Sequence, residues 1–86
     1  MRDAHMRFSN LESRADAALA GVDQIRSQQQ AQGFDIRGDI LAAMNRLHRQ
    51  LDMSRQALAQ NDLESANDFM KRADADTERL EKFLGR

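Results

Sequence analysis

Apolar residues recur along this chain at steps of three and four positions, in three separate series. The first series is Met1, Ala4, Phe8, Leu11, Ala15, Ala18, Val22 and Ile25. The second is Ile40, Met44, Leu47, Leu51 and Leu58, with Ser54 in one polar slot. The third is Leu63, Ala66, Met70, Ala73, Thr77, Leu80 and Leu84. This spacing places apolar side chains on one face of an α-helix and fits no β-strand, so the pattern predicts three amphipathic helices.

The first break between the series carries the signals of a helix end followed by a helix start. A glutamine-rich run ends at Gly33, which can take the left-handed conformation that terminates a helix. Phe34 follows, at a position that such endings often fill with an apolar contact. Asp35 or Asp39 can then cap the second helix through its carboxylate, so we expect that helix to begin between 36 and 40.

The second break is shorter. Asn61 suits the left-handed position at a helix end, and Asp62 suits an N-cap. Continuing the second series would place its next apolar residue at Ser65, whereas the third series begins at Leu63. A tight reversal explains this change of register better than one continuous helix, which would need a stutter.

Short connections force consecutive helices to run antiparallel. The chain is therefore expected to form an all-α, up-down-up three-helix bundle with coiled-coil-like packing and helices over about 2–32, 36–60 and 62–84. Its length leaves room for a single helical-bundle domain, 1–86. The first helix is the longest, at roughly 45 Å against roughly 35 Å for the other two. We expect residues 1–7 to project past the second turn.

Composition indicates a thin core. Apolar residues make up 41% of the chain, but thirteen of them are Ala, so few large side chains are available for burial. A domain of this size would be marginal as a monomer, and association would help it. The chain has no Cys, which excludes disulfides and thiolate metal sites.

Charge argues against several classes of partner. The net charge is −1, with both signs interspersed, so no segment offers the basic field that nucleic acid binding requires. The longest apolar run, 40–44, is far shorter than the roughly 20 residues that cross a bilayer. No apolar signal-peptide core follows the first Met. We therefore expect no nucleic acid partner, no membrane partner and, by default, a cytoplasmic protein.

The two histidines are the first candidates for chemistry. Helical di-iron sites place a Glu three residues before a His, but Asn45 stands before His48. His48 is within reach of Asp52 one turn later, which favours a partly buried or surface-paired imidazole. A phosphoacceptor role is the alternative, because neutral imidazole is nucleophilic near pH 7. His5 lies in the expected projection. These residues predict no enzyme, no cofactor and no metal.

Two other patterns have ordinary explanations. The tripeptide 37–39, Arg-Gly-Asp, spells a cell-adhesion motif, but a helix start accounts for the same residues. On the third helix, opposite charges recur three or four positions apart, as on a solvated helix face. The expected pairs are Asp68 with Arg72, Asp76 with Arg79, and Glu78 with Lys82.

Two classes of function remain. The favoured hypothesis is a non-enzymatic helical interaction module, self-associating or binding another protein, forming a homodimer or one end of a larger protein. The residues expected to carry self-association are Met1, Ala4, Met6 and Phe8 on the projection, and Phe69 and Phe83 beside the third series. The alternative is a regulatory bundle in which the arginines of the second helix bind a small anion.

Overall fold

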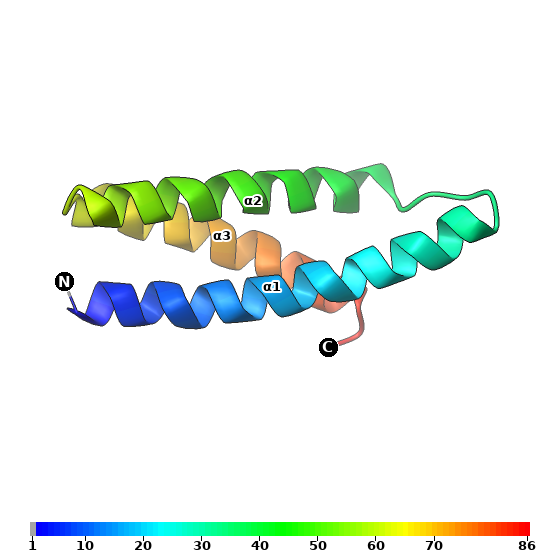
Figure 1. Ribbon diagram of the computed structural model, residues 1–86, viewed down its shortest axis with the longest axis horizontal. Coiled ribbons are helices and arrows are strands. Elements are labelled where there is room, and N and C mark those ends of the chain that lie inside the picture. The colour runs from blue at the N-terminus through cyan, green and yellow to red at the C-terminus, as the bar shows by residue number, and fades with distance from the viewer. Residues whose placement is uncertain (1) are drawn as a thin grey trace.

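The computed structural model describes residues 2–86 and contains three helices, α1 (Arg2–Ala31), α2 (Gly38–Ala59) and α3 (Leu63–Phe83). They run up, down and up beside one another in an elongated bundle that measures 46 × 19 × 16 Å (Figure 1). The predicted all-α three-helix bundle is confirmed. Every helix boundary lies within two residues of its predicted position.

Each helix ends in the same hydrogen-bonded motif. A residue with positive φ follows the last turn: Gly33 at 86°, Asn61 at 59° and Gly85 at 79°. The next N–H then donates to a carbonyl five residues back: Phe34 to Gln29 at 2.8 Å, Asp62 to Ala57 at 2.8 Å and Arg86 to Glu81 at 2.9 Å. This Schellman motif satisfies carbonyls that the helix itself leaves unpaired. The predicted roles of Gly33 and Asn61 are confirmed.

The second turn also starts α3. An oxygen of the Asp62 carboxylate accepts a hydrogen bond from the Ser65 N–H at 3.2 Å, so Asp62 is the predicted N-cap. One residue therefore closes the end of α2 through its N–H and opens α3 through its side chain.

The prediction that Asp35 or Asp39 caps α2 is wrong. The N-cap is Arg37, and no side chain caps the helix. Asp35 turns back to α1, where Arg26 Nε binds it at 2.9 Å, and it accepts the Ile36 N–H at 2.7 Å. Asp39 pairs with Arg37 at 2.7 Å. Both carboxylates are thus held by arginines, and neither residue is the N-cap of α2.

The core is a single cluster of apolar side chains drawn from all three helices. Helix α2 packs most extensively against α3, and α1 packs more against α3 than against α2. The buried apolar residues are Ala4, Phe8, Leu11, Ala15, Ala18, Leu19, Val22, Ile36, Ile40, Ala43, Met44, Leu47, Leu51, Ala57, Leu58, Ala66, Met70, Ala73 and Leu80.

Several positions differ from the predicted core; among them, Ala43 and Ala57 are buried outside the predicted series, and Ile25 and Leu84 are only half-buried. Leu19 and Ile36 are buried although neither belongs to a predicted series. Leu63, expected in the core, is 38% exposed. It is the first residue of α3, and helical side chains tilt toward the N-terminus, so it extends toward the end of the bundle and away from its centre.

Two hydroxyl residues occupy core positions without leaving unpaired groups. Ser54 and Thr77 are both fully buried. Each donates to a carbonyl one turn earlier in its own helix, Ser54 to Gln50 at 2.7 Å and Thr77 to Ala73 at 2.8 Å. A small polar side chain that satisfies itself in this way can replace an apolar one in the series.

The longer first helix projects at the opposite end from the one predicted. Ala4 is buried, and Arg7 donates to the Asn67 side chain of α3 at 3.1 Å, so residues 1–7 do not overhang in the part that the structure describes. The last turns of α1 and the 32–37 connection instead extend beyond the end of α3 (Figure 1). The C-terminal end of α3 meets α1 at Gly21, where a Cβ would lie 3.0 Å from Leu84 Cδ1.

The second turn yields a paired prediction. Asp62→Ala should lower the melting temperature by about 4 to 8 °C, because the first turn of α3 loses its cap. Asn61→Gly should leave the melting temperature unchanged or raise it, because glycine adopts positive φ without strain. Circular dichroism melts of both variants check this. A larger loss for Asn61→Gly than for Asp62→Ala would contradict the motif.

The same cap should depend on pH. Hydrogen bonds from the Ser65 side chain and then its N–H hold the pKa of Asp62 below the ordinary 3.8. The cap's contribution is therefore complete above that ordinary value and is lost as pH falls through the lower folded-state pKa. The difference in melting temperature between the native chain and Asp62→Ala should shrink below about pH 4. A difference that stays constant down to pH 2 would show that the charge of Asp62 is irrelevant.

The core supplies a third prediction. Leu80 is fully buried, so Leu80→Ala should destabilise the fold by roughly 2 to 5 kcal/mol, enough to unfold much of a marginal domain. Met53 is 43% exposed on α2, so Met53→Ala should cost under about 0.5 kcal/mol. Urea denaturation measures both. Equal losses would mean that the buried face of α2 is rotated from the one described.

Candidate functional site

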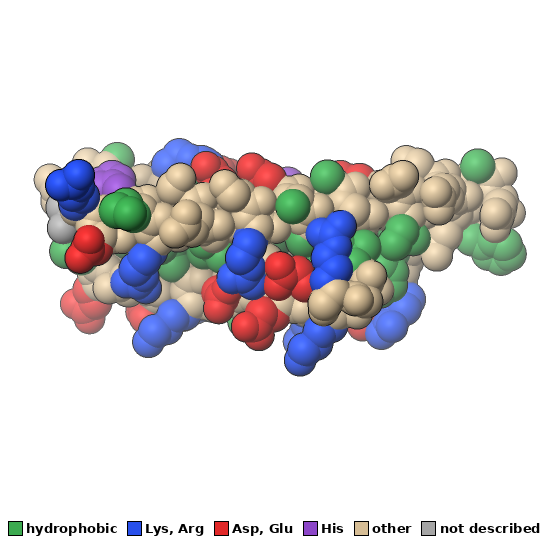
Figure 2. All heavy atoms as spheres, turned by 90° about the horizontal axis from the view of Figure 1, so that it is seen from below, with side chains coloured by type: hydrophobic (Ala, Val, Ile, Leu, Met, Phe, Trp, Pro, Cys, Tyr) green, Lys and Arg blue, Asp and Glu red, His purple; other side chains and the backbone are tan. Residues whose placement is uncertain are grey.

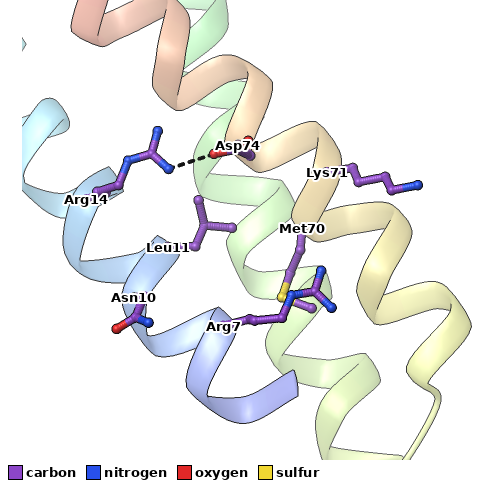
Figure 3. Close-up of a pocket in the computed structure, with 7 residues that line it drawn as sticks. All are labelled: Arg7, Asn10, Leu11, Arg14, Met70, Lys71 and Asp74. Atoms are coloured by element: carbon purple, nitrogen blue, oxygen red, sulfur yellow. Dashed lines mark hydrogen bonds and ion pairs between the residues drawn. The ribbon is translucent and has the colours of Figure 1, made fainter. Parts of the chain in front are cut away.

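A groove of about 290 Å³ runs along the seam between α1 and α3 (Figure 3). Two of its charged side chains, Arg14 and Asp74, bind one another. Arg14 of α1 binds Asp74 at 2.8 Å and Glu81 at 2.9 Å, and these hydrogen bonds, with Glu81 the larger cause, raise the pKa of Arg14. Arg7 donates to Asn67. The lining is Arg7, Asn10, Leu11, Arg14, Met70, Lys71 and Asp74. The ion pairs of Arg14 hold α1 against α3 along this groove, whereas Arg7 and Lys71 form no ion pair within residues 2–86.

Two further arginines join the helices elsewhere. Arg46 of α2 binds the largely buried Asp76 of α3 through two hydrogen bonds of 3.1 and 3.3 Å. Arg55 of α2 binds Glu12 of α1 and lies over the Phe8 ring, with Cζ 5.5 Å from the ring centroid. These contacts pin α2 to both of its neighbours.

The ion pairs predicted along α3 do not form within residues 2–86. Asp76 binds Arg46 and not Arg79. Neither Asp68 with Arg72 nor Glu78 with Lys82 comes within ion-pair distance. The acidic residues of α3 that form ion pairs, Asp74, Asp76 and Glu81, bind arginines of α1 or α2. Part of the charge pattern on α3 therefore stabilises contacts between helices.

A second groove, of about 490 Å³, lies between α2 and α3. We call it the α2–α3 groove. Three arginines, two polar residues and two apolar residues line it: Arg46, Arg49, Arg72, Gln50, Asp52, Met53 and Phe69. Within residues 2–86, neither Arg49 nor Arg72 takes part in an ion pair. Arg7 and Lys71 of the first groove likewise form no ion pair within residues 2–86, but only the α2–α3 groove adds an aromatic side chain, Phe69, to such unpaired positive charge.

The projecting end of the bundle is the third candidate surface. Phe34 is 69% exposed in the connection between α1 and α2, the largest exposure among the big apolar side chains described. Four half-buried apolar residues, Ile25, Leu41, Phe83 and Leu84, lie toward the base of this projection, where Leu84 packs at Gly21. Figure 2 shows apolar side chains reaching the surface toward this end, while acidic and basic side chains alternate over the middle of that face.

The residues predicted to carry self-association are dispersed. Ala4 and Phe8 lie inside their own core, whereas Met6 is 57% exposed. Phe69 and Phe83 are half-buried at different surfaces, Phe69 in the α2–α3 groove and Phe83 near the projecting end. Met1 lies outside the described residues. The spacing of apolar residues does not single out Phe34, because its position after a helix end predicts an intrachain apolar contact instead of exposure.

The candidates for chemistry do not converge. His5 and His48 are both exposed, and Asp52, the expected partner of His48, pairs with Arg55 at 2.9 Å. In the adhesion-like tripeptide, Arg37 and Asp39 bind one another. Among residues 2–86, no three His, Cys, Asp or Glu side chains are grouped so that they could hold a metal ion. None of the helices described is long and apolar enough to cross a membrane.

The chain matches no protein-family model, no curated protein and no solved structure. Its function is therefore argued from its own surfaces.

Proposed function

We propose that this chain is a non-enzymatic helical interaction module that pairs with a second copy of itself through the projecting end. The observation that carries the proposal is the exposure of Phe34, a large aromatic side chain, at the tip of that end. Isolated exposed apolar residues are ordinary on protein surfaces. This one has a fixed backbone, and half-buried apolar residues lie at the base of the same projection; these two features make it a candidate for binding.

The backbone of Phe34 is held from both sides. Its N–H donates to the Gln29 carbonyl at 2.8 Å, and Asp35 is tied to Arg26 at 2.9 Å. A Schellman motif usually packs the residue at this position on an apolar side chain of the preceding helix, three or four residues before its cap. Gln28 and Gln29 stand there, so the motif supplies no apolar partner. A partner that covers the ring would order little additional backbone.

Other apolar residues must contribute, because burial of the Phe34 ring alone does not offset the free-energy cost of association. Burying an exposed Phe contributes about 1.5 to 3 kcal/mol, and a two-fold dimer buries two of them. Association costs an estimated 4 kcal/mol or more in lost translational and rotational freedom. The half-buried Ile25, Leu41 and Phe83 must therefore join the contact. Even then we expect a weak dimer, with dissociation constants in the micromolar to millimolar range.

Sedimentation equilibrium tests the proposal. The native chain should show an average mass that rises from monomer toward dimer as protein is increased from micromolar to millimolar concentrations. Phe34→Ser should weaken the dimer by at least about tenfold, because the largest exposed ring leaves the interface. The melting temperature of the dilute monomer should not change, since Phe34 is outside the core.

Met6→Ser is the matched control. Met6 is 57% exposed at the opposite end of the bundle, where the sequence had placed the association surface. If the projecting end is the interface, Met6→Ser should leave the dimer intact. A dimer weakened by Met6→Ser and not by Phe34→Ser would move the interface to the N-terminal end. A constant monomer mass for the native chain would overturn the proposal.

A further inference from the structure

The α2–α3 groove combines positive charge with apolar surface. On α2 its residues recur at steps of three and four, Arg46, Arg49, Gln50 and Met53, and thus form one continuous stripe. Phe69 and Arg72 of α3, three positions apart, face that stripe. Both helices therefore contribute an arginine and an apolar side chain to the same depression.

Some charged side chains of the groove already form ion pairs within the fold, and others remain available to a ligand. Arg46 is committed to Asp76, which raises the pKa of Arg46 and fixes its guanidinium. The carboxylate of Asp52, the one acidic side chain in the lining, is already bound by Arg55 at 2.9 Å. Arg49 and Arg72 remain as exposed guanidinium groups that form no ion pair within residues 2–86. Their planar donor arrays suit the oxygens of a carboxylate or a phosphate.

The rest of the lining suits the uncharged part of a ligand. Met53 is 43% exposed and Phe69 is half-buried, so both offer apolar surface. The side chain of Gln50 lies between the charged and apolar parts of the stripe, and its buried Oε1 has no hydrogen-bond partner among residues 2–86. A buried acceptor without a donor is unfavourable, and a reoriented carboxamide could accept from a bound hydroxyl or N–H.

We propose that the α2–α3 groove binds a small organic anion, in which a carboxylate or phosphate contacts Arg49 and Arg72 and an apolar or aromatic body covers Met53 and Phe69. The volume of about 490 Å³ falls within the range of small-molecule sites. Because the groove is open to solvent at the surface, its ion pairs are screened and the affinity should be modest. This site is separate from the projecting end, and its occupation does not require self-association.

Calorimetric titration at constant ionic strength tests the site with four probes. Phenyl phosphate and benzoate carry both features, inorganic phosphate carries only the charge, and benzyl alcohol carries only the ring. We expect both aromatic anions to bind at least about tenfold more tightly than inorganic phosphate, because the ring adds buried apolar area. Benzyl alcohol should not bind measurably. Saturation by phenyl phosphate alone would restrict the site to phosphates, and saturation by benzoate alone to carboxylates.

Variants locate the binding. Arg49→Gln and Arg72→Gln should each weaken phenyl phosphate binding by about tenfold, since each removes a charged donor. Arg79→Gln is the matched control, because Arg79 is an exposed arginine of the same helix, forms no ion pair within residues 2–86 and lies outside the groove lining. Met53→Gln should weaken phenyl phosphate and leave inorganic phosphate unchanged. All four residues are exposed, so the folded state should persist.

Three results would overturn the site. Equal affinity for inorganic and phenyl phosphate would reduce the groove to a simple charged patch. An equal loss in Arg79→Gln and Arg72→Gln would show that binding follows net charge and not the groove. Failure of both aromatic anions to bind at millimolar concentrations would remove the proposal altogether. Since Phe34→Ser should not alter any of these titrations, failure here and failure of self-association are distinguishable.

Discussion

The tight turn between α2 and α3 is the constraint on which the rest of the molecule depends. Only residues 60–62 separate the two helices. The hydrogen bond from the Asp62 N–H to the Ala57 carbonyl closes this short turn, so α2 and α3 must run antiparallel. The alanines and self-satisfied hydroxyls on their facing sides allow close packing, and this pair makes the most extensive contact in the bundle. Helix α1 is then laid mainly against α3. One added helix can cover one face of the pair, so the α2–α3 groove stays open on the outside.

The length of the first connection decides where α1 ends relative to its neighbours. The stretch 32–37 is longer than the second turn and does not align the end of α1 with the start of α2. Leu84 packs at Gly21, so α3 reaches only that level of α1, and everything beyond it projects. The same geometry that buries Ala4 beside the second turn leaves Phe34 uncovered at the other end. The overhang is a direct consequence of helices of 30 and 21 residues whose N-terminal ends are level.

Local chemistry made part of this fold predictable. Gly33, Asn61 and Asp62 act through their own backbone and side chains, so the ends of the helices could be read from single residues. The spacing of apolar residues likewise identified most of the core. Axial shift and rotation are not local, because they depend on how three helices settle together. That is why the sequence placed the overhang at residues 1–7, put Leu63 inside and missed Leu19.

Ion pairs between helices also depend on the non-local arrangement and could not be predicted from sequence spacing. They divide the arginines into those that stabilise the fold and those that form no ion pair within residues 2–86. Asp76 has Arg79 within one turn, yet it binds Arg46 across the helix seam, where burial strengthens the interaction. Arg14 and Arg55 also reach carboxylates on other helices.

Once these pairs are formed, Arg49 and Arg72 remain unpaired within residues 2–86 in the same groove, beside apolar surface. The chain's net charge is −1, and the bundle does not need these two positive charges for its stability. They lie along the middle of the α2–α3 hairpin, whereas Phe34 lies outside the hairpin, in the connection between α1 and α2. Two copies joined end to end would therefore keep both grooves facing solvent. The lining of the groove shares no residue with the apolar residues of the projecting end among residues 2–86, so we expect anion binding and pairing to be energetically independent.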